Sequence, residues 1–105
     1  MSIIETQVVD GIATTDDGKE LIMLITDHLN WDNEMEHLLL LQDKINTYIE
    51  FWEDKQYVTI YQDKSINKAV IEIHFLHGVS KNCMNFIKTV NKQLSMTNIS
   101  IEVGK

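Results

Sequence analysis

The fold is decided by one stretch, Thr26-Asp-His-Leu-Asn-Trp-Asp-Asn-Glu-Met-Glu-His-Leu-Leu-Leu-Leu-Gln-Asp-Lys-Ile-Asn-Thr-Tyr-Ile-Glu-Phe-Trp52. It reads as the end of a strand, a short polar turn and then the longest helix of the chain. Apolar side chains recur at the spacing of one helical face, at Leu38, Leu41, Ile45, Tyr48, Ile49 and Trp52. The stripe predicts a helix from about Asp32 to about Asp54, and a stripe this wide needs a sheet to bury it.

The start of this helix is marked by residues that cap helices. Asn30, Asp32 or Asn33 can each serve as the N-cap, and Asn33 with Glu36 has the spacing of a capping box. Acidic side chains in the first turn also favour a helix start here, because each interacts with the helix dipole by roughly 0.3–1 kcal/mol.

Composition narrows the class of protein. The chain has 105 residues and 44% hydrophobic residues, as expected for one globular domain spanning 1–105. It has no apolar run long enough to cross a membrane and no basic leader at its start, so we expect a cytoplasmic protein. The single Cys83 excludes an internal disulfide framework. The net charge of −7 argues against nucleic-acid and membrane binding, and would suit a basic partner.

The flanking segments predict four strands and a second helix. The strands are expected at 7–15, 19–27, 69–77 and 98–103, and the second helix at 81–96. Asp16-Asp17-Gly18 is a hairpin turn, and 55–68 is an extended connector with or without a short edge strand. The result is an α+β fold of order β-β-α-β-α-β, with two helices on one face of a four-stranded mixed sheet. The last strand–helix–strand unit should be parallel and right-handed.

The second strand is apolar on both of its faces. Leu21, Met23 and Ile25 point one way, and Ile22 and Leu24 point the other, so we place this strand centrally in the sheet. Helices on one face leave Ile22 and Leu24 on the opposite side, together with Leu76. These three residues are a candidate interface for a second copy or another protein. Alternatively, the connector or the N-terminal segment folds over them.

The turn before the long helix is the candidate ligand site. It gathers Asp27, His28, Trp31, Glu34 and His37 within a short span, and turns that open helices are common ligand sites. The Glu34-x-x-His37 spacing occurs in metal sites of helical bundles, but those sites need further ligands from other helices. The competing interpretation is structural: the carboxylates interact with the helix dipole, and the tryptophan packs at the rim of the core.

The remaining reactive side chains favour structural roles. His74 and His77 fall on opposite faces by parity and cannot chelate an ion together, and we expect His74 to be an exposed strand residue. Cys83 lies on the apolar stripe of the second helix, as a small core residue would. We find no catalytic set, no glycine-rich phosphate loop and no cofactor motif.

The segments Asp27-His-Leu-Asn-Trp31, Glu36-His-Leu-Leu-Leu-Leu-Gln42, Lys44-Ile-Asn46, Tyr48-Ile49 and Phe51 carry a resemblance. The chain resembles a small bacterial family known as a domain of unknown function, most specifically from Val9 to Glu53. The segment Val70-Ile-Glu-Ile-His-Phe75 is compatible with that family. The connector departs from it, with Tyr57-Val-Thr-Ile-Tyr61 in place of a proline-containing segment. The resemblance implies a bacterial, cytoplasmic α+β protein, and it carries no established activity, ligand or catalytic residue.

Two classes of function follow from these patterns. The first is a non-enzymatic interaction module that self-associates or binds another protein, for example as an immunity or inhibitor protein. It is favoured by the small size, the acidity, the missing catalytic set and the two-sided second strand. The alternative is a small-ligand or metal-binding protein with its site at the turn 27–37.

Overall fold

The predicted order of elements and the predicted fold class are confirmed by the computed structural model, which describes residues 3–62 and 65–104. The elements are β1 (Gly11–Thr14), β2 (Glu20–Asp27), α1 (Glu34–Glu53), the 3₁₀ helix η1 (Gln56–Thr59), β3 (Lys68–Phe75), α2 (Lys81–Gln93) and β4 (Ile99–Val103).

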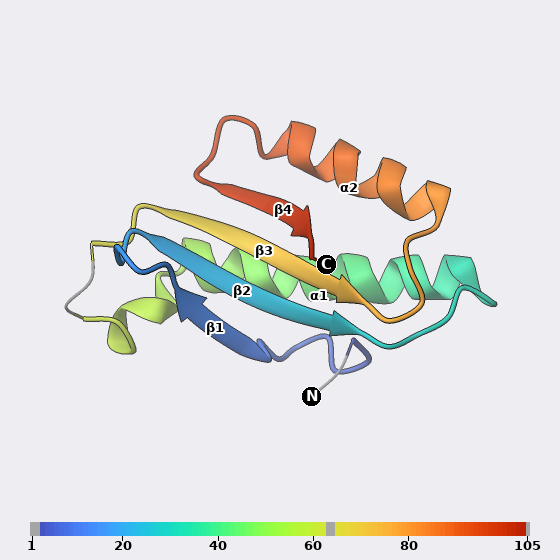
Figure 1. Cartoon of the computed structure of the whole chain (residues 1–105), viewed down its shortest axis with the longest axis horizontal. Coiled ribbons are helices and arrows are strands. Elements are labelled where there is room, and N and C mark those ends of the chain that lie inside the picture. Colours follow the sequence, from blue (N-terminus) through green and yellow to red (C-terminus); the bar gives the residue numbers. More distant parts are fainter. Residues whose placement is uncertain (1–2, 63–64, 105) are drawn as a thin grey trace.

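The four strands form one sheet in the order β1-β2-β3-β4. Strand β1 is antiparallel to β2, whereas β2, β3 and β4 run parallel to one another. Helices α1 and α2 form the two crossovers between parallel neighbours, and both crossovers step in the same direction across the sheet. Crossovers of one hand that step the same way place their helices on the same face. In Figure 1 the sheet lies in front of α1, and no helix crosses the face turned toward the reader.

The core lies between the sheet and the helices. Alternate residues of β2 are fully buried, namely Leu21, Met23 and Ile25, because side chains of a strand alternate between its two faces. Their neighbours across the sheet and on the helices complete the core: Ala69, Ile71, Ile73, Ile99, Ile101, Leu41, Ile45, Tyr48, Cys83 and Ile87. The central position predicted for the second strand is confirmed, since β2 pairs with β1 on one side and β3 on the other.

Both helices begin at side-chain caps, and the cap of α1 is Asn33, one of the three residues that the sequence offers. The Asn33 side chain accepts a hydrogen bond from the Glu36 backbone N–H at 3.3 Å, and its Nδ2 donates to Glu36 Oε2 at 2.9 Å. Ser80 Oγ accepts from the Cys83 backbone N–H at 3.1 Å. These bonds occupy donors that a helix start leaves free, so the turns before α1 and α2 are fixed in place.

The first strand is shorter than predicted, and the segment before it is ordered against α1. The segment before β1 is separated from β2 at Asp10. There the Tyr48 hydroxyl accepts from the Asp10 N–H at 2.9 Å and donates to the Leu24 carbonyl at 2.5 Å. A side chain thus replaces a strand–strand hydrogen bond, and β1 begins only at Gly11. Ile3 is fully buried, so the described N-terminal segment packs into the core from this residue on, while Met1 and Ser2 lie outside the described residues.

The connector after α1 is a compact turn, which corrects the expectation of an extended segment. Lys55 adopts a left-handed conformation at φ 55° and ends the helix. Tyr57 then stacks on Trp52 with ring centroids 4.9 Å apart. This stacking holds η1 against the end of α1, and no strand forms among residues 55–62 and 65–67. Residues 63–64 of the connector lie outside the described part.

Candidate functional site

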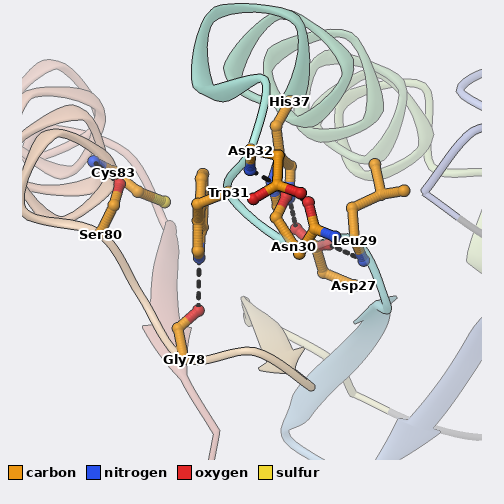
Figure 2. Close-up of polar contacts among 9 residues, drawn as sticks. All are labelled: Asp27, Leu29, Asn30, Trp31, Asp32, His37, Gly78, Ser80 and Cys83. Atoms are coloured by element: carbon orange, nitrogen blue, oxygen red, sulfur yellow. Dashed lines mark hydrogen bonds and ion pairs between the residues drawn. The ribbon is translucent and has the colours of Figure 1, made fainter.

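Two residues of the predicted ligand turn form a buried pair. His37 Nε2 lies 2.5 Å from Asp27 Oδ2, and the two side chains are 2% and 0% exposed. The other ring nitrogen, Nδ1, lies 3.0 Å from the Asn30 carbonyl, and Asp27 Oδ1 accepts from the Leu29 N–H at 3.1 Å. The pair therefore ties the end of β2 to the first turn of α1 (Figure 2).

One of these contacts places a hydrogen on the His37 ring. A carbonyl only accepts hydrogen bonds, so Nδ1 of His37 carries a hydrogen. The short contact between Nε2 and Asp27 Oδ2 then needs one further proton, held by either partner. A histidine that acts as a general base needs a ring nitrogen within reach of a substrate. Both nitrogens of His37 are engaged within the fold, which makes this pair a structural clasp.

Trp31 covers the pair on one side. Its ring lies 3.8 Å from the His37 ring between centroids, at 20°, and its Nε1 donates to the Gly78 carbonyl at 3.0 Å. Figure 2 shows the indole between His37 and Cys83. Burial, together with the Asp27 and Glu34 carboxylates, raises the pKa of the Cys83 thiol to about 12. A protonated, buried thiol is no nucleophile, and the prediction that Cys83 is a core residue is confirmed.

The other two predicted ligand residues point elsewhere. Glu34 Oε1 accepts from Asn82 Nδ2 at 2.8 Å. Hydrogen bonds from Ser80 and Asn82 hold the pKa of the Glu34 carboxyl below its ordinary value. This contact joins the first turns of α1 and α2. His28 is exposed. The structure thus brings together Asp27, Trp31 and His37 but not Glu34 or His28.

A cavity of about 300 Å³ lies beside the turn. Its lining residues are Ile4, Leu29, Asn30, Asp32, Asn33, Glu36, His37 and Leu40. Of the five predicted ligand residues only His37 lines it, and both ring nitrogens of His37 have partners in the fold. Among residues 3–62 and 65–104, no three His, Cys, Asp or Glu side chains are grouped so as to hold a metal ion.

The second candidate site is the face of the sheet that the helices leave uncovered. Its centre is apolar and consists of Ile22, Leu24 and Val70, all half-buried. The strand register surrounds this centre with Glu20, Lys68, Glu72, His74, Ser100 and Glu102. We call these nine residues the open sheet face. Ile22 and Leu24 therefore lie opposite the helical layer, and their role as an interface stays a prediction.

The carboxyl end of the open sheet face is formed by the end of β3. Leu76 follows the strand and is 71% exposed. His74 Nε2 lies 2.7 Å from Glu72 Oε1 and its side chain is 39% exposed, so His74 is partly exposed with a partner. A Cβ on Gly104 would lie 2.5 Å from the His74 ring. Gly104, which follows β4, therefore packs closely on this imidazole and holds it beside Glu72.

A buried lysine on α1 is the main polar feature that sequence reasoning missed. Lys44 is 0% exposed, and its Nζ donates to the carbonyls of Glu5 and Val8 at 2.8 and 2.7 Å. Asp10 Oδ2 lies 3.0 Å from the same nitrogen as an ion pair, although neither Asp10 oxygen accepts a regular hydrogen bond within the described structure. The sequence signal was available, because Lys44 falls between Leu41 and Tyr48 on the apolar stripe.

Fold and sites together define the class of this protein: a small two-layer α+β domain whose helices cover one face of the sheet. The chain belongs to a protein family described as "Family of unknown function (DUF6572)", whose model matches residues 1–105. The resemblance to a family of unknown function is thereby confirmed. No curated protein and no solved structure matches the chain. No helix in the described part of the chain has the length and apolar character needed to span a bilayer.

Proposed function

We propose that this protein is a non-enzymatic interaction module that binds a basic protein partner through the open sheet face. The observation that carries the proposal is the half-buried apolar centre of Ile22, Leu24 and Val70 on the side opposite both helices. A sheet face with an apolar centre and a charged rim has the anatomy of a protein interface. The clasp at Asp27 and His37 supports the same class, since its hydrogen-bonding groups are engaged internally.

Charge selects the kind of partner. The rim of the open sheet face carries Glu20, Glu72 and Glu102 against the single lysine Lys68, in a chain of net charge −7. A second copy docked face to face would bring these carboxylates against one another, and such like-charge contacts oppose association. A partner with lysines or arginines around an apolar centre would neutralise the rim and would be steered toward it at low salt.

The proposal is tested by crosslinking and then by binding. A photo-crosslinking amino acid at Ser100, on the open sheet face, should capture a partner in cells, whereas the same group at Lys88 on α2 should not. The captured protein is identified, purified and titrated calorimetrically. We expect Leu24→Ser to weaken binding about tenfold or more, as loss of an interface anchor does. Glu102→Lys should weaken it further than Glu53→Lys, which changes the net charge equally at the end of α1.

Two outcomes would contradict the proposed role of the open sheet face. One is equal capture of the same proteins from Ser100 and Lys88. The other is an identified partner whose affinity is unchanged by both Leu24→Ser and Glu102→Lys. A partner with an acidic binding surface would also exclude the charge argument.

A small-ligand site is the second candidate function, favoured by the cavity beside Leu29, Leu40 and Glu36. Its apolar and carboxylate lining would suit a small amine with an apolar body. A thermal-shift series with alkylamines should then raise the unfolding temperature of the parent but not of Glu36→Gln. No shift with any amine at millimolar concentration would remove this candidate, because saturation at 100 times the dissociation constant stabilises by about 2.7 kcal/mol.

A further inference from the structure

The free edge of β4 carries backbone groups that alternate in direction. The Asn98 carbonyl and the Gly104 N–H bond to Ala69 and Ile73 of β3, at 2.8 Å in both cases. Even-numbered residues of this segment thus face β3, and the intervening odd-numbered residues direct their N–H and C=O groups outward. Outward groups of this kind are a template for an added strand.

The side chain of Asn91, on α2, binds to the middle of this outward-facing edge. The Ile101 N–H donates to Asn91 Oδ1 at 2.8 Å, and Asn91 Nδ2 donates to the Ile101 carbonyl at 2.9 Å. The amide thereby makes the donor and acceptor pair that a neighbouring strand would make. Thr97 approaches the preceding outward residue in a weaker way, with its Oγ1 3.4 Å from both the N and the O of Ile99.

The opposite edge of the sheet is also restricted. Strand β1 has only four residues, and the Tyr61 hydroxyl lies 3.5 Å from the outward carbonyl of Ile12. Short edge strands and covered edges are the means by which proteins avoid unwanted strand pairing. Both edges are therefore partly covered. The two hydrogen bonds of Asn91 cover the β4 edge more firmly than the single Tyr61 contact covers the β1 edge.

We infer that the Asn91 side chain takes the hydrogen-bonding place of a neighbouring strand. It thereby prevents a second copy of this chain from adding a strand at the β4 edge. Its position on α2 carries a sequence signal, since Cys83, Ile87 and Asn91 are spaced by four on the core-facing stripe. A polar side chain on this buried stripe needs a hydrogen-bond partner, and the backbone of Ile101 supplies one. The consequence for association is that a second copy cannot extend this sheet from the β4 edge.

The test compares Asn91→Ala with Lys92→Ala, a substitution at the neighbouring exposed position. Light scattering after size exclusion should give a larger mass for Asn91→Ala than for the parent at equal concentration, and an unchanged mass for Lys92→Ala. Amide exchange of Ile101 should accelerate in dilute, unassociated Asn91→Ala by about fivefold, the factor that corresponds to one net hydrogen bond of about 1 kcal/mol.

A second variant separates edge pairing from general instability. Val103→Pro removes an outward N–H of β4 without touching the bonds to β3, and proline is tolerated at such edge positions. The double variant that carries both Asn91→Ala and Val103→Pro should have the same mass as the parent. The inference is overturned if the double variant stays associated, or if Asn91→Ala keeps the parent mass at equal concentration.

Discussion

At the scale of single residues, the clasp of Asp27 and His37 makes a prediction that depends on proton positions. Asp27→Asn keeps the geometry, because an amide can donate to a neutral Nε2 while Nδ1–H stays on the Asn30 carbonyl. Its side-chain oxygen can still accept from Leu29. Asp27→Ala removes both contacts and leaves a buried imidazole nitrogen without a partner, which should cost about 3–5 kcal/mol.

Urea unfolding measures the difference. We expect Asp27→Asn to lie within about 1 kcal/mol of the parent, well above Asp27→Ala in stability. Asp43→Ala, at an exposed position of α1, serves as the control and should change stability by less than about 0.5 kcal/mol. Equal losses for Asp27→Asn and Asp27→Ala would mean that the negative charge, and not the hydrogen-bond geometry, holds the turn.

Lys44 makes a second prediction at this scale. Lys44→Met fills a similar volume but removes the ammonium hydrogen bonds to the Glu5 and Val8 carbonyls and the counter-charge of Asp10. We expect a loss of about 3 kcal/mol. Hydrogen exchange should locate part of that loss in residues 3–10, because Lys44 donates to two carbonyls of this segment. Lys19→Met, at an exposed lysine, should leave both readouts at parent values, and the idea fails if Lys44→Met does so too.

At the scale of elements, the end of α1 contains a strained residue. Lys55 adopts φ 55°, a conformation that costs residues with a Cβ about 1–2 kcal/mol but glycine nothing. Lys55→Gly should therefore stabilise the protein by about 0.5–1 kcal/mol after the entropy of glycine in the unfolded chain is subtracted. Thermal unfolding would show a higher midpoint for Lys55→Gly and a lower one for Glu50→Gly inside the helix. A lower midpoint for both would refute this account of the helix end.

Elements defined by local patterns were predictable, and those defined by distant partners were not. The apolar stripe and caps of α1, and Ser80 before α2, are signals within a few residues of each other. The start of β1 depends on the Tyr48 hydroxyl, 38 residues away from Asp10. The shape of the connector depends on Tyr57 stacking on Trp52. No periodicity within either segment carries that information.

At the scale of the whole molecule, the candidate sites also divide into features set by local patterns and features set by distant partners. Apolar character on both faces of β2 was enough to expect an uncovered group at Ile22 and Leu24, because one helical layer covers one face. The turn before α1 was rich in polar side chains, but their partners come from elsewhere: Gly78 for Trp31 and Asn82 for Glu34. Composition identified the cluster. Only the three-dimensional contacts show which partners each of these side chains has.

Two buried side chains of the core also predict how the stability of the protein changes at alkaline pH. Burial raises the pKa of the Tyr48 phenol from 10.0 to about 12, and that of the Cys83 thiol from 9.0 to about 12. Unfolded chains lose these protons first, so they bind fewer protons than the native state above pH 9. The free energy of unfolding must then fall as pH rises, by at most about 1.4 kcal/mol per pH unit for each group. This stabilisation is complete below pH 9 and is lost toward pH 12.

The two groups can be separated by where the fall begins. Between pH 9 and 10 the thiol contributes most of the slope, because its unfolded pKa is the lower of the two. Cys83→Ala should flatten the stability curve in that interval and leave the fall above pH 10, where Tyr48 contributes. Urea unfolding at half-unit steps from pH 8 to 11 supplies the curve. A parent curve that stays level to pH 11 would show that neither side chain is shielded from water as the packing of α1 and α2 requires.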